Sequence, residues 1–409
     1  MTGRKPDLSY SKRGGKTVYK VRIQSNIMSE ALEKLDSSKY EISENADTPD
    51  VIIVRSESLL EMDINPELLC IVRAGAGYNN IPIERCADEG VVVFNTPGAN
   101  ADSVKELVLC GLFLSSRDIL GGLDWVRTEA AKSDEITKLV EKEKVRFVGP
   151  EVFGKTLGVI GLGAIGAKIA QAATTLGMRV FGYDPYLSVE SAWKLSPDII
   201  QASDLDTIYK NSDYVTIHIP YLNSTHHFIS KKNIEKMKPG VRIINLSRAE
   251  LVCDEDILAG LASGHVACYV TDFPTEKTAG APGVIAIPHL GASTPESEEN
   301  CVSMACSEVI EYVENGNICN AVNMANAYLP RTDDPRICIV HFNIPEMIAK
   351  ITSKISSFGV NIENMLNAST KGSLYAYTML DVSALPEGIE DAVCKINGVI
   401  RVRVIPQIM

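Results

Sequence analysis

The chain has 409 residues, which is more than one hydrophobic core usually organises, so we expect two or three domains. Its formal net charge of −12 argues against nucleic acid as a partner, because phosphate backbones attract basic surfaces. Hydrophobic residues make up 45% of the chain, but no apolar run approaches the ~20 residues of a membrane span, so we expect no membrane partner.

Cysteine usage and the N-terminal composition indicate a cellular compartment. The ten cysteines form no CxxC pair and no Cys/His ligand spacing, so we expect reduced thiols, no metal site and a cytoplasmic location. Residues 1–17 are basic and lack the apolar core of a signal peptide, which favours an unstructured tail over a targeting sequence.

Short strand-like runs alternate with helical patterns from Lys20 to the run "VVVFNTPG" at residues 91–98. Alternation of strands and helices predicts a parallel sheet with helices on its faces. We therefore predict a first α/β lobe over residues 1–100, to which the chain returns over residues 301–326.

A second alternating unit is predicted over residues 101–300. It opens on the amphipathic stretch "ADSVKELVLCGLFLSSRDIL", and its strand-like runs continue from "TLGVI" to "VIAIP". The order of elements again predicts a doubly wound parallel sheet, so the fold class is α/β with two such lobes.

The last part of the chain has a different order of elements. Residues 325–335 are polar and include Pro330 and Pro335, which is typical of a linker. Residues 336–409 then read as β-α-β-β-α-β, the order of a small ferredoxin-like module.

The strongest local motif is "GLGAIG", in which Gly161, Gly163 and Gly166 follow a predicted strand and open a predicted helix. These glycines allow a tight turn, close approach of the backbone to a pyrophosphate, and close packing of helix on strand. The next strand ends in Asp184, about 20 residues further on, where a carboxylate accepts hydrogen bonds from ribose and repels the 2′-phosphate of NADP. The motif predicts an NAD site.

Three later strands are each followed by polar residues suited to hydride transfer at a carbinol carbon. Arg248 follows "RIINLS", Asp272 and Glu276 follow "CYVT", and His289 follows "VIAIP". Ligands of such sheets bind beyond the carboxyl ends of the strands, so we expect these side chains to lie near the cofactor. An imidazole can take the hydroxyl proton, a carboxylate can stabilise the imidazolium, and a guanidinium can bind the developing carbonyl.

Several motifs together resemble one family. The stretches "RAGAGYNNIPIERC", "TPGAN", "GKTLGVIGLGAIG", "INLSRAELV", "TDFPTE" and "PHLGAST" are similar to landmarks of the D-isomer-specific 2-hydroxyacid dehydrogenases, and the resemblance runs from about Val18 to the end. It implies a flavodoxin-like substrate lobe, a Rossmann NAD lobe and a C-terminal ferredoxin-like ACT domain over residues 336–409.

The resemblance also implies roles for individual residues. The catalytic residues would be Arg248, Glu276 and His289. The cofactor NAD would be bound by Gly161, Gly163, Ile165, Gly166, Asp184, Pro220, Asp272 and Gly291. The substrate would be bound by Arg55, Arg73, Ala74, Gly75 and Asn100.

Family members with a C-terminal ACT domain oxidise D-3-phosphoglycerate with NAD to 3-phosphohydroxypyruvate, the first step of the phosphorylated route to L-serine. The resemblance therefore implies a small anionic, phosphorylated substrate. It also implies an L-serine effector held between paired ACT domains by His341, Asn343 and Asn361, and hence a homodimer or homotetramer.

Two other functions remain open on the sequence. One is a sibling dehydrogenase that acts on glyoxylate or hydroxypyruvate and needs no phosphate-binding arginines. The other is a non-catalytic NAD-sensing protein of the same fold. Activity with and without a phosphate group on the substrate separates these alternatives.

Overall fold

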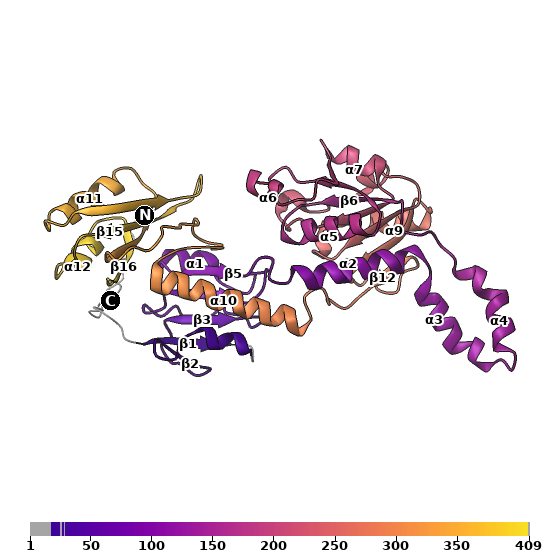
Figure 1. Ribbon diagram of the computed structural model, residues 1–409, viewed down its shortest axis with the longest axis horizontal. Coiled ribbons are helices and arrows are strands. Elements are labelled where there is room, and N and C mark those ends of the chain that lie inside the picture. Colours follow the sequence, from indigo (N-terminus) through magenta and orange to yellow (C-terminus); the bar gives the residue numbers. More distant parts are fainter. Residues whose placement is uncertain (1–17, 25–26, 28, 408–409) are drawn as a thin grey trace. The chain divides into compact units, whose positions relative to one another are not determined.

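The computed structural model describes residues 18–24, 27 and 29–407, so the tail predicted over residues 1–17 lies outside the described part of the chain. The chain divides into two compact units, Met1–Ala99 with Glu298–Met409, and Asn100–Ser297. Figure 1 shows their elements. None of the described helices is both long and apolar enough to cross a membrane.

The first unit contains a sheet of five parallel strands in the order β2-β1-β3-β4-β5. Every residue of strands β3 and β5 is buried, which explains why their sequences are apolar, with Asn95 at the end of β5 as the exception. This order is the flavodoxin-like one, as the family resemblance implies. The strands are β1 (Tyr19–Ile23), β2 (Tyr40–Ser43), β3 (Val51–Val54), β4 (Cys70–Arg73) and β5 (Val92–Asn95).

Two helices of the first unit pack on this sheet, α1 (Ile83–Asp88) and the long α10 (Pro295–Asn315). Figure 1 shows α10 running alongside the strands. Its residues Val302, Ala305 and Val309 share one apolar core with the strands, so the chain returns to the first lobe through this helix.

The second unit is built on seven parallel strands in the order β12-β11-β10-β9-β6-β7-β8. Counted from β6, this is the Rossmann order with one added edge strand, and the order reverses between β6 and β9. The strands are β6 (Thr156–Ile160), β7 (Arg179–Tyr183), β8 (Ile199–Gln201), β9 (Tyr214–Ile217), β10 (Val241–Asn245), β11 (Val266–Thr271) and β12 (Val284–Ala286).

Helices of the second unit connect and cover these strands. Figure 1 shows α3 and α4 extending away from the sheet. The helices are α2 (Ala101–Ser116), α3 (Ile119–Thr128), α4 (Ile136–Glu143), α5 (Ala164–Thr175), α6 (Val189–Trp193), α7 (Leu205–Asn211), α8 (Lys231–Ile234) and α9 (Asp254–Ala262).

The C-terminal module has the predicted β-α-β-β-α-β order, and its antiparallel strands lie in the order β14-β15-β13-β16. This arrangement is compatible with an ACT-like domain. The elements are β13 (Arg336–Phe342), α11 (Met347–Ser356), β14 (Ile362–Ala368), β15 (Tyr375–Val382), α12 (Ile389–Cys394) and β16 (Val399–Ile405).

The C-terminal sheet is buried on both of its faces. Ile337 and Ile339 belong to a core with α11 and α12. The alternate residues Cys338 and Val340, by contrast, belong to the same core as the first sheet and α10. The module is therefore packed onto the first lobe and is more than a domain attached by a linker.

Arg336 is the centre of that attachment. Its side chain is fully buried and forms an ion pair with Asp381, with 2.6 Å between Nε and Oδ1. Its remaining donors reach the carbonyl oxygens of Asn315, Leu329 and Pro330 at 2.7 to 2.9 Å. The guanidinium thus ties the end of α10, the predicted linker and the C-terminal sheet together.

We expect Arg336→Ala to destabilise the first unit by about 3–5 kcal/mol, because Asp381 would remain as a buried carboxylate without its partner. Lys39→Ala is the control, since it removes an ion pair with Glu314 in which Lys39 is 52% exposed, and such pairs contribute about 1 kcal/mol or less. Urea-dependent amide exchange in β13 measures both. Equal, small losses in the two variants would show that the buried pair is not structural.

Candidate active site

The glycine-rich turn joins β6 to α5. Gly161 has φ of +90°, and a Cβ there would lie 2.4 Å from the carbonyl oxygen of His218. A Cβ at Gly166 would lie 1.9 Å from the carbonyl oxygen of Gly161, so both positions exclude any side chain. At Gly163, the residue before α5, nothing lies within 4 Å of an added Cβ. The helix start is therefore open to close approach by a phosphate group.

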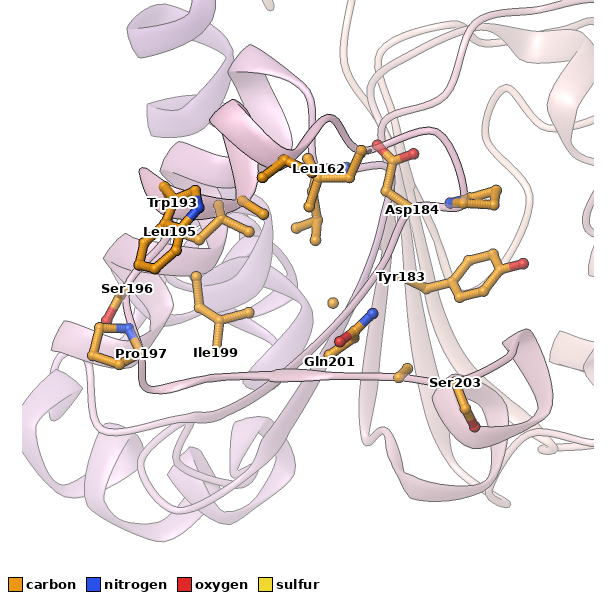
Figure 2. A pocket seen from close by; sticks show the side chains of 16 residues that line it. Leu162, Tyr183, Asp184, Trp193, Leu195, Ser196, Pro197, Ile199, Gln201 and Ser203 are labelled. Atoms are coloured by element: carbon orange, nitrogen blue, oxygen red, sulfur yellow. Dashed lines mark hydrogen bonds between the residues drawn. The ribbon is translucent and has the colours of Figure 1, made fainter.

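Asp184 follows β7 and is bound to this turn. Its Oδ2 accepts a hydrogen bond from the amide of Leu162 and its Oδ1 one from the amide of Tyr186, both at 2.9 Å. Figure 2 shows Leu162 close to the carboxylate. Each carboxylate oxygen has a second lone pair, which is available to a ribose hydroxyl.

A pocket of about 750 Å³ adjoins Asp184 (Figure 2). Its lining is mainly apolar, with Leu162, Trp193 and Ile199, and it includes the polar side chains of Gln201 and Ser203. None of the predicted catalytic residues lines this pocket. It belongs to the β7–β8 side of the sheet, away from the strands that carry the catalytic residues.

Asp272 lies directly after β11 and is 1% exposed. Its Oδ2 accepts a hydrogen bond from the Gly291 amide at 3.1 Å, and its backbone oxygen accepts one from the His289 amide at 2.9 Å. Burial raises the pKa of Asp272, and the Gly291 amide and the charges of His289 and Arg248 oppose that increase. Its Oδ1 is buried without a partner among the described residues, so it can accept a hydrogen bond from a ligand.

Phe273 brings Arg248 and His289 to one place. Its ring centroid lies 4.4 Å from that of His289, and the guanidinium carbon of Arg248 lies 5.6 Å from it. The backbone of His289 has φ of +34°, and the residue is exposed. Arg248, Asp272 and His289 thus form one cluster beyond β10, β11 and β12, as the sequence predicts.

Glu276 is the predicted catalytic residue that the structure does not bring into this cluster. Its side chain is exposed, and within residues 29–407 no hydrogen bond or ion pair of Glu276 is found. Its partnership with His289 stays a prediction. The hydrogen bond between Asp272 and His289 is made by the backbone oxygen of Asp272, and the Asp272 carboxylate interacts with His289 only through its charge.

Four of the predicted substrate residues lie in the first unit, where β3 and β4 end, and the fifth, Asn100, is the first residue of the second unit. Arg55 directly follows β3. The Nε of Arg73, the last residue of β4, donates a hydrogen bond to the carbonyl oxygen of Arg55 at 3.1 Å. Gly75 has φ of +144°, and a Cβ there would lie 1.8 Å from Nη1 of Arg73. Ala74, which lies between Arg73 and Gly75, is buried. Asn100 directly precedes α2, and its Oδ1 is buried and has no hydrogen-bond partner in the described chain.

The predicted effector residues differ in exposure. His341 is buried, with Nδ1 2.8 Å from the carbonyl oxygen of Phe342 and Nε2 2.8 Å from Oγ1 of Thr378. Asn343 and Asn361 are exposed. Both ring nitrogens of the histidine are therefore occupied within the module, whereas the two amides lie at its surface.

His218 is a site residue that sequence reasoning missed. It directly follows β9, and its carbonyl oxygen lies under Gly161. Its Nε2 is 2.8 Å from Oγ1 of Thr216, and burial lowers its pKa to about 3, so the ring is neutral. A polar residue at the end of the strand beside β6 is the signal that could have identified His218.

Two further residues predicted to bind the cofactor lie near the same turn in sequence. Pro220 lies in the loop that follows β9, and Ile165 is the second residue of α5.

Comparison with known proteins identifies the family. Residues 112–291 match the D-isomer specific 2-hydroxyacid dehydrogenase, NAD binding domain. A hydroxypyruvate reductase of Thermotoga maritima is 36% identical over 262 residues, which are 61% of this chain and 80% of that enzyme. The chain belongs to the D-isomer specific 2-hydroxyacid dehydrogenases.

Other relatives of the chain are D-3-phosphoglycerate dehydrogenases. The Bacillus subtilis enzyme is 32% identical over 311 residues, which are 74% of this chain and 57% of that enzyme. The chain therefore spans little more than half the length of such relatives. A solved 3-phosphoglycerate dehydrogenase of Entamoeba histolytica has a TM-score of 0.56 at 24% identity, covering 76% of this chain and 100% of that one, which shows the shared fold.

The residues present fit the NAD that the family domain binds. Gly163 leaves space at the start of α5, and Asp184 has lone pairs available beside the turn. The buried, unpartnered Oδ1 of Asp272 can accept a hydrogen bond from a carboxamide. The predicted NAD site is thus consistent with both the family and the local geometry.

We expect the protein to bind NADH much more tightly than NADPH, and Asp184→Ala to weaken NADH binding about ten- to hundredfold, because a charge-assisted hydrogen bond is lost. Asp198→Ala changes an exposed carboxylate of the same region and serves as the control. Binding of both cofactors can be followed by nucleotide fluorescence. Equal affinities of the unmutated protein for the two would refute the role of Asp184.

We expect His289→Ala to lower kcat by about 10²–10⁴-fold while NADH still binds, because general acid–base help is lost. In Glu276→Gln, the acid limb of the kcat/KM profile should move to lower pH, since the imidazolium would lose a stabilising anion. Steady-state rates across pH measure both effects. An unchanged profile in Glu276→Gln would exclude Glu276 as the partner and leave Asp272 in that position.

Proposed function

We propose that the protein is an NAD-dependent dehydrogenase that oxidises the C2 hydroxyl of D-3-phosphoglycerate to give 3-phosphohydroxypyruvate. The observation that carries this proposal is the cluster of Arg248, Asp272 and His289 beyond three adjacent strand ends, in the unit that holds the dinucleotide turn. The D-3-phosphoglycerate dehydrogenases at about 30% identity support the choice of substrate. The reaction would be the first step of the phosphorylated route to L-serine.

The chemistry follows from the side chains of the cluster. Nε2 or Nδ1 of His289 would accept the proton of the C2 hydroxyl, and the carboxylate of Glu276 would stabilise the resulting imidazolium, with the buried carboxylate of Asp272 as the alternative. The guanidinium of Arg248 would bind the developing carbonyl oxygen or the neighbouring carboxylate of the substrate. NAD, when bound, accepts the hydride from C2.

Arg55 and Arg73 supply the cations that a phosphorylated substrate needs. Arg55 directly follows β3, and Arg73 is the last residue of β4. The absence of a side chain at Gly75 leaves room for the Arg73 guanidinium. On a protein of net charge −12, two arginines at adjacent strand ends favour a local anion site. Asn100 and Ala74 would complete the substrate contacts.

A second candidate function is reduction of hydroxypyruvate or glyoxylate. The Thermotoga maritima hydroxypyruvate reductase favours it, because this chain covers 80% of that enzyme. Such an enzyme would not require Arg55 and Arg73 to bind a phosphate group. The two candidates therefore differ in their dependence on the phosphate.

We expect kcat/KM to be far higher for D-3-phosphoglycerate than for D-glycerate, and Arg73→Ala to reduce that preference about ten- to hundredfold, since charge-assisted hydrogen bonds to the phosphate are lost. Arg85→Ala is the control, because Arg85 instead donates to the carbonyl oxygens of Leu60 and Met62. Initial rates of NAD reduction measure both. Equal activity with and without the phosphate would favour the second candidate.

We further propose that L-serine inhibits the enzyme through paired C-terminal modules, which would make the protein a homodimer or homotetramer. The exposed amides of Asn343 and Asn361 support an effector site at the module surface. Exposed apolar side chains on α3, Ile119, Leu120 and Leu123, support self-association.

We also propose a cytoplasmic location. All ten cysteines are free thiols, which is consistent with a reducing compartment.

We expect L-serine to inhibit the unmutated enzyme and to lose that effect in Asn343→Ala and Asn361→Ala, because an amino-acid ligand needs both donors and acceptors. Uninhibited kcat should be the same in all three proteins. Initial rates with and without serine measure this, and light scattering gives the oligomeric state. Inhibition that survives both substitutions would refute this effector site.

A further inference from the structure

Arg55, one of the two arginines at the strand ends of the first sheet, forms an ion pair with Glu298. Nη1 of Arg55 lies 2.6 Å from Oε1 of Glu298, and the two side chains are 36% and 49% exposed. Arg55 follows β3, and Glu298 lies in the second turn of α10. Both residues belong to the same compact unit.

Arg73 is held beside this pair by the backbone. Its Nε donates to the carbonyl oxygen of Arg55 at 3.1 Å, and its guanidinium occupies the space over Gly75. Two guanidinium groups therefore come from adjacent strands, and the carboxylate of Glu298 is placed on one of them. An anion approaching Arg55 meets a position that already holds an anion.

We propose that Glu298 is a specificity-determining residue that competes with the phosphate group of the substrate for Arg55. This inference rests on the proposed function. In the absence of substrate the carboxylate neutralises Arg55, and the phosphate displaces it when substrate binds. A substrate without a phosphate leaves the Arg55–Glu298 pair intact and gains nothing from Arg55.

The energetics allow this exchange. Ion pairs with this much exposure are weak, so the pair opens at little cost. A phosphate presents a larger charge and several acceptor oxygens, and it binds a guanidinium through two parallel hydrogen bonds. The carboxylate therefore reduces the affinity of the site for phosphate moderately, without blocking it.

The acidic residues at the start of α10 also stabilise the helix, and this effect must be distinguished from competition for Arg55. Negative charges in the first turns stabilise a helix through its dipole, whatever their partners. Glu299 is adjacent to Glu298, but its Oε2 accepts a hydrogen bond from Oγ of Ser29 at 2.6 Å. Glu299→Gln thus removes the same charge from the same turn without touching Arg55, and it is the matched control.

The test compares the unmutated full chain with Glu298→Gln, Glu299→Gln and Arg55→Ala. Glu298→Gln should lower both KM for D-3-phosphoglycerate and the inhibition constant of inorganic phosphate about two- to fivefold, with kcat unchanged. Glu299→Gln should leave these values as in the unmutated protein. In an Arg55→Ala background, Glu298→Gln should have no further effect, because the competition requires the guanidinium.

Calorimetric binding of inorganic phosphate separates this inference from the proposed function. If D-3-phosphoglycerate is not turned over but Glu298→Gln still tightens phosphate binding, the proposed substrate is wrong and the competition at Arg55 stands. If D-3-phosphoglycerate is turned over but Glu298→Gln changes neither KM nor phosphate affinity, the competition is refuted. An equal gain in Glu299→Gln would also refute it, since the effect would then be general charge removal.

Discussion

The carbonyl groups at the end of α10 need hydrogen-bond donors, and the C-terminal module supplies them. A helix end leaves its last carbonyl groups without intrahelical partners, and burying them unpaired is costly. Here two arginines and a tyrosine of the C-terminal sheet reach across to this end of the helix. The donors are Arg336, Tyr377 and Arg403, and the acceptors are the carbonyl oxygens of Tyr312, Val313, Asn315 and Gly316. The first lobe and the module are therefore one packed body.

The same helix, α10, also carries Glu298, which contacts Arg55. The helix begins shortly after the loop of His289, carries Glu298 against Arg55 in its second turn, and ends on the module in which serine is proposed to bind. A change at the C-terminal sheet thus acts on the same helix that carries Glu298, the ion-pair partner of Arg55, for which we propose a role in substrate binding. The cluster around Asp272 depends on different contacts, the Gly291 amide and the ring of Phe273.

The parts of the fold and site that follow from local constraints could be predicted from the sequence. Gly161 and Gly166 are dictated by carbonyl oxygens that exclude a Cβ, and such a constraint leaves a readable motif. Arg248, Asp272 and His289 follow from the rule that strand ends converge. The packing of the C-terminal sheet could not be predicted in this way, because "RICIVHF" is apolar at every position up to Val340 except Arg336 and does not reveal which partner covers each face. The contact of Phe273 with His289, and the exposure of Glu276, depend on loop conformations that no periodicity encodes.

Removal of hydride from C2 of the D isomer is tested most directly with D-3-phosphoglycerate deuterated at C2. With NAD and the unmutated chain, we expect deuterium to leave C2 and appear in the reduced nicotinamide, and 3-phosphohydroxypyruvate to form in equal amount. The L isomer should not react. Deuterium that remains at C2 while NAD is reduced, or equal consumption of both isomers, would contradict the assignment of this chain as a D-specific dehydrogenase of 3-phosphoglycerate.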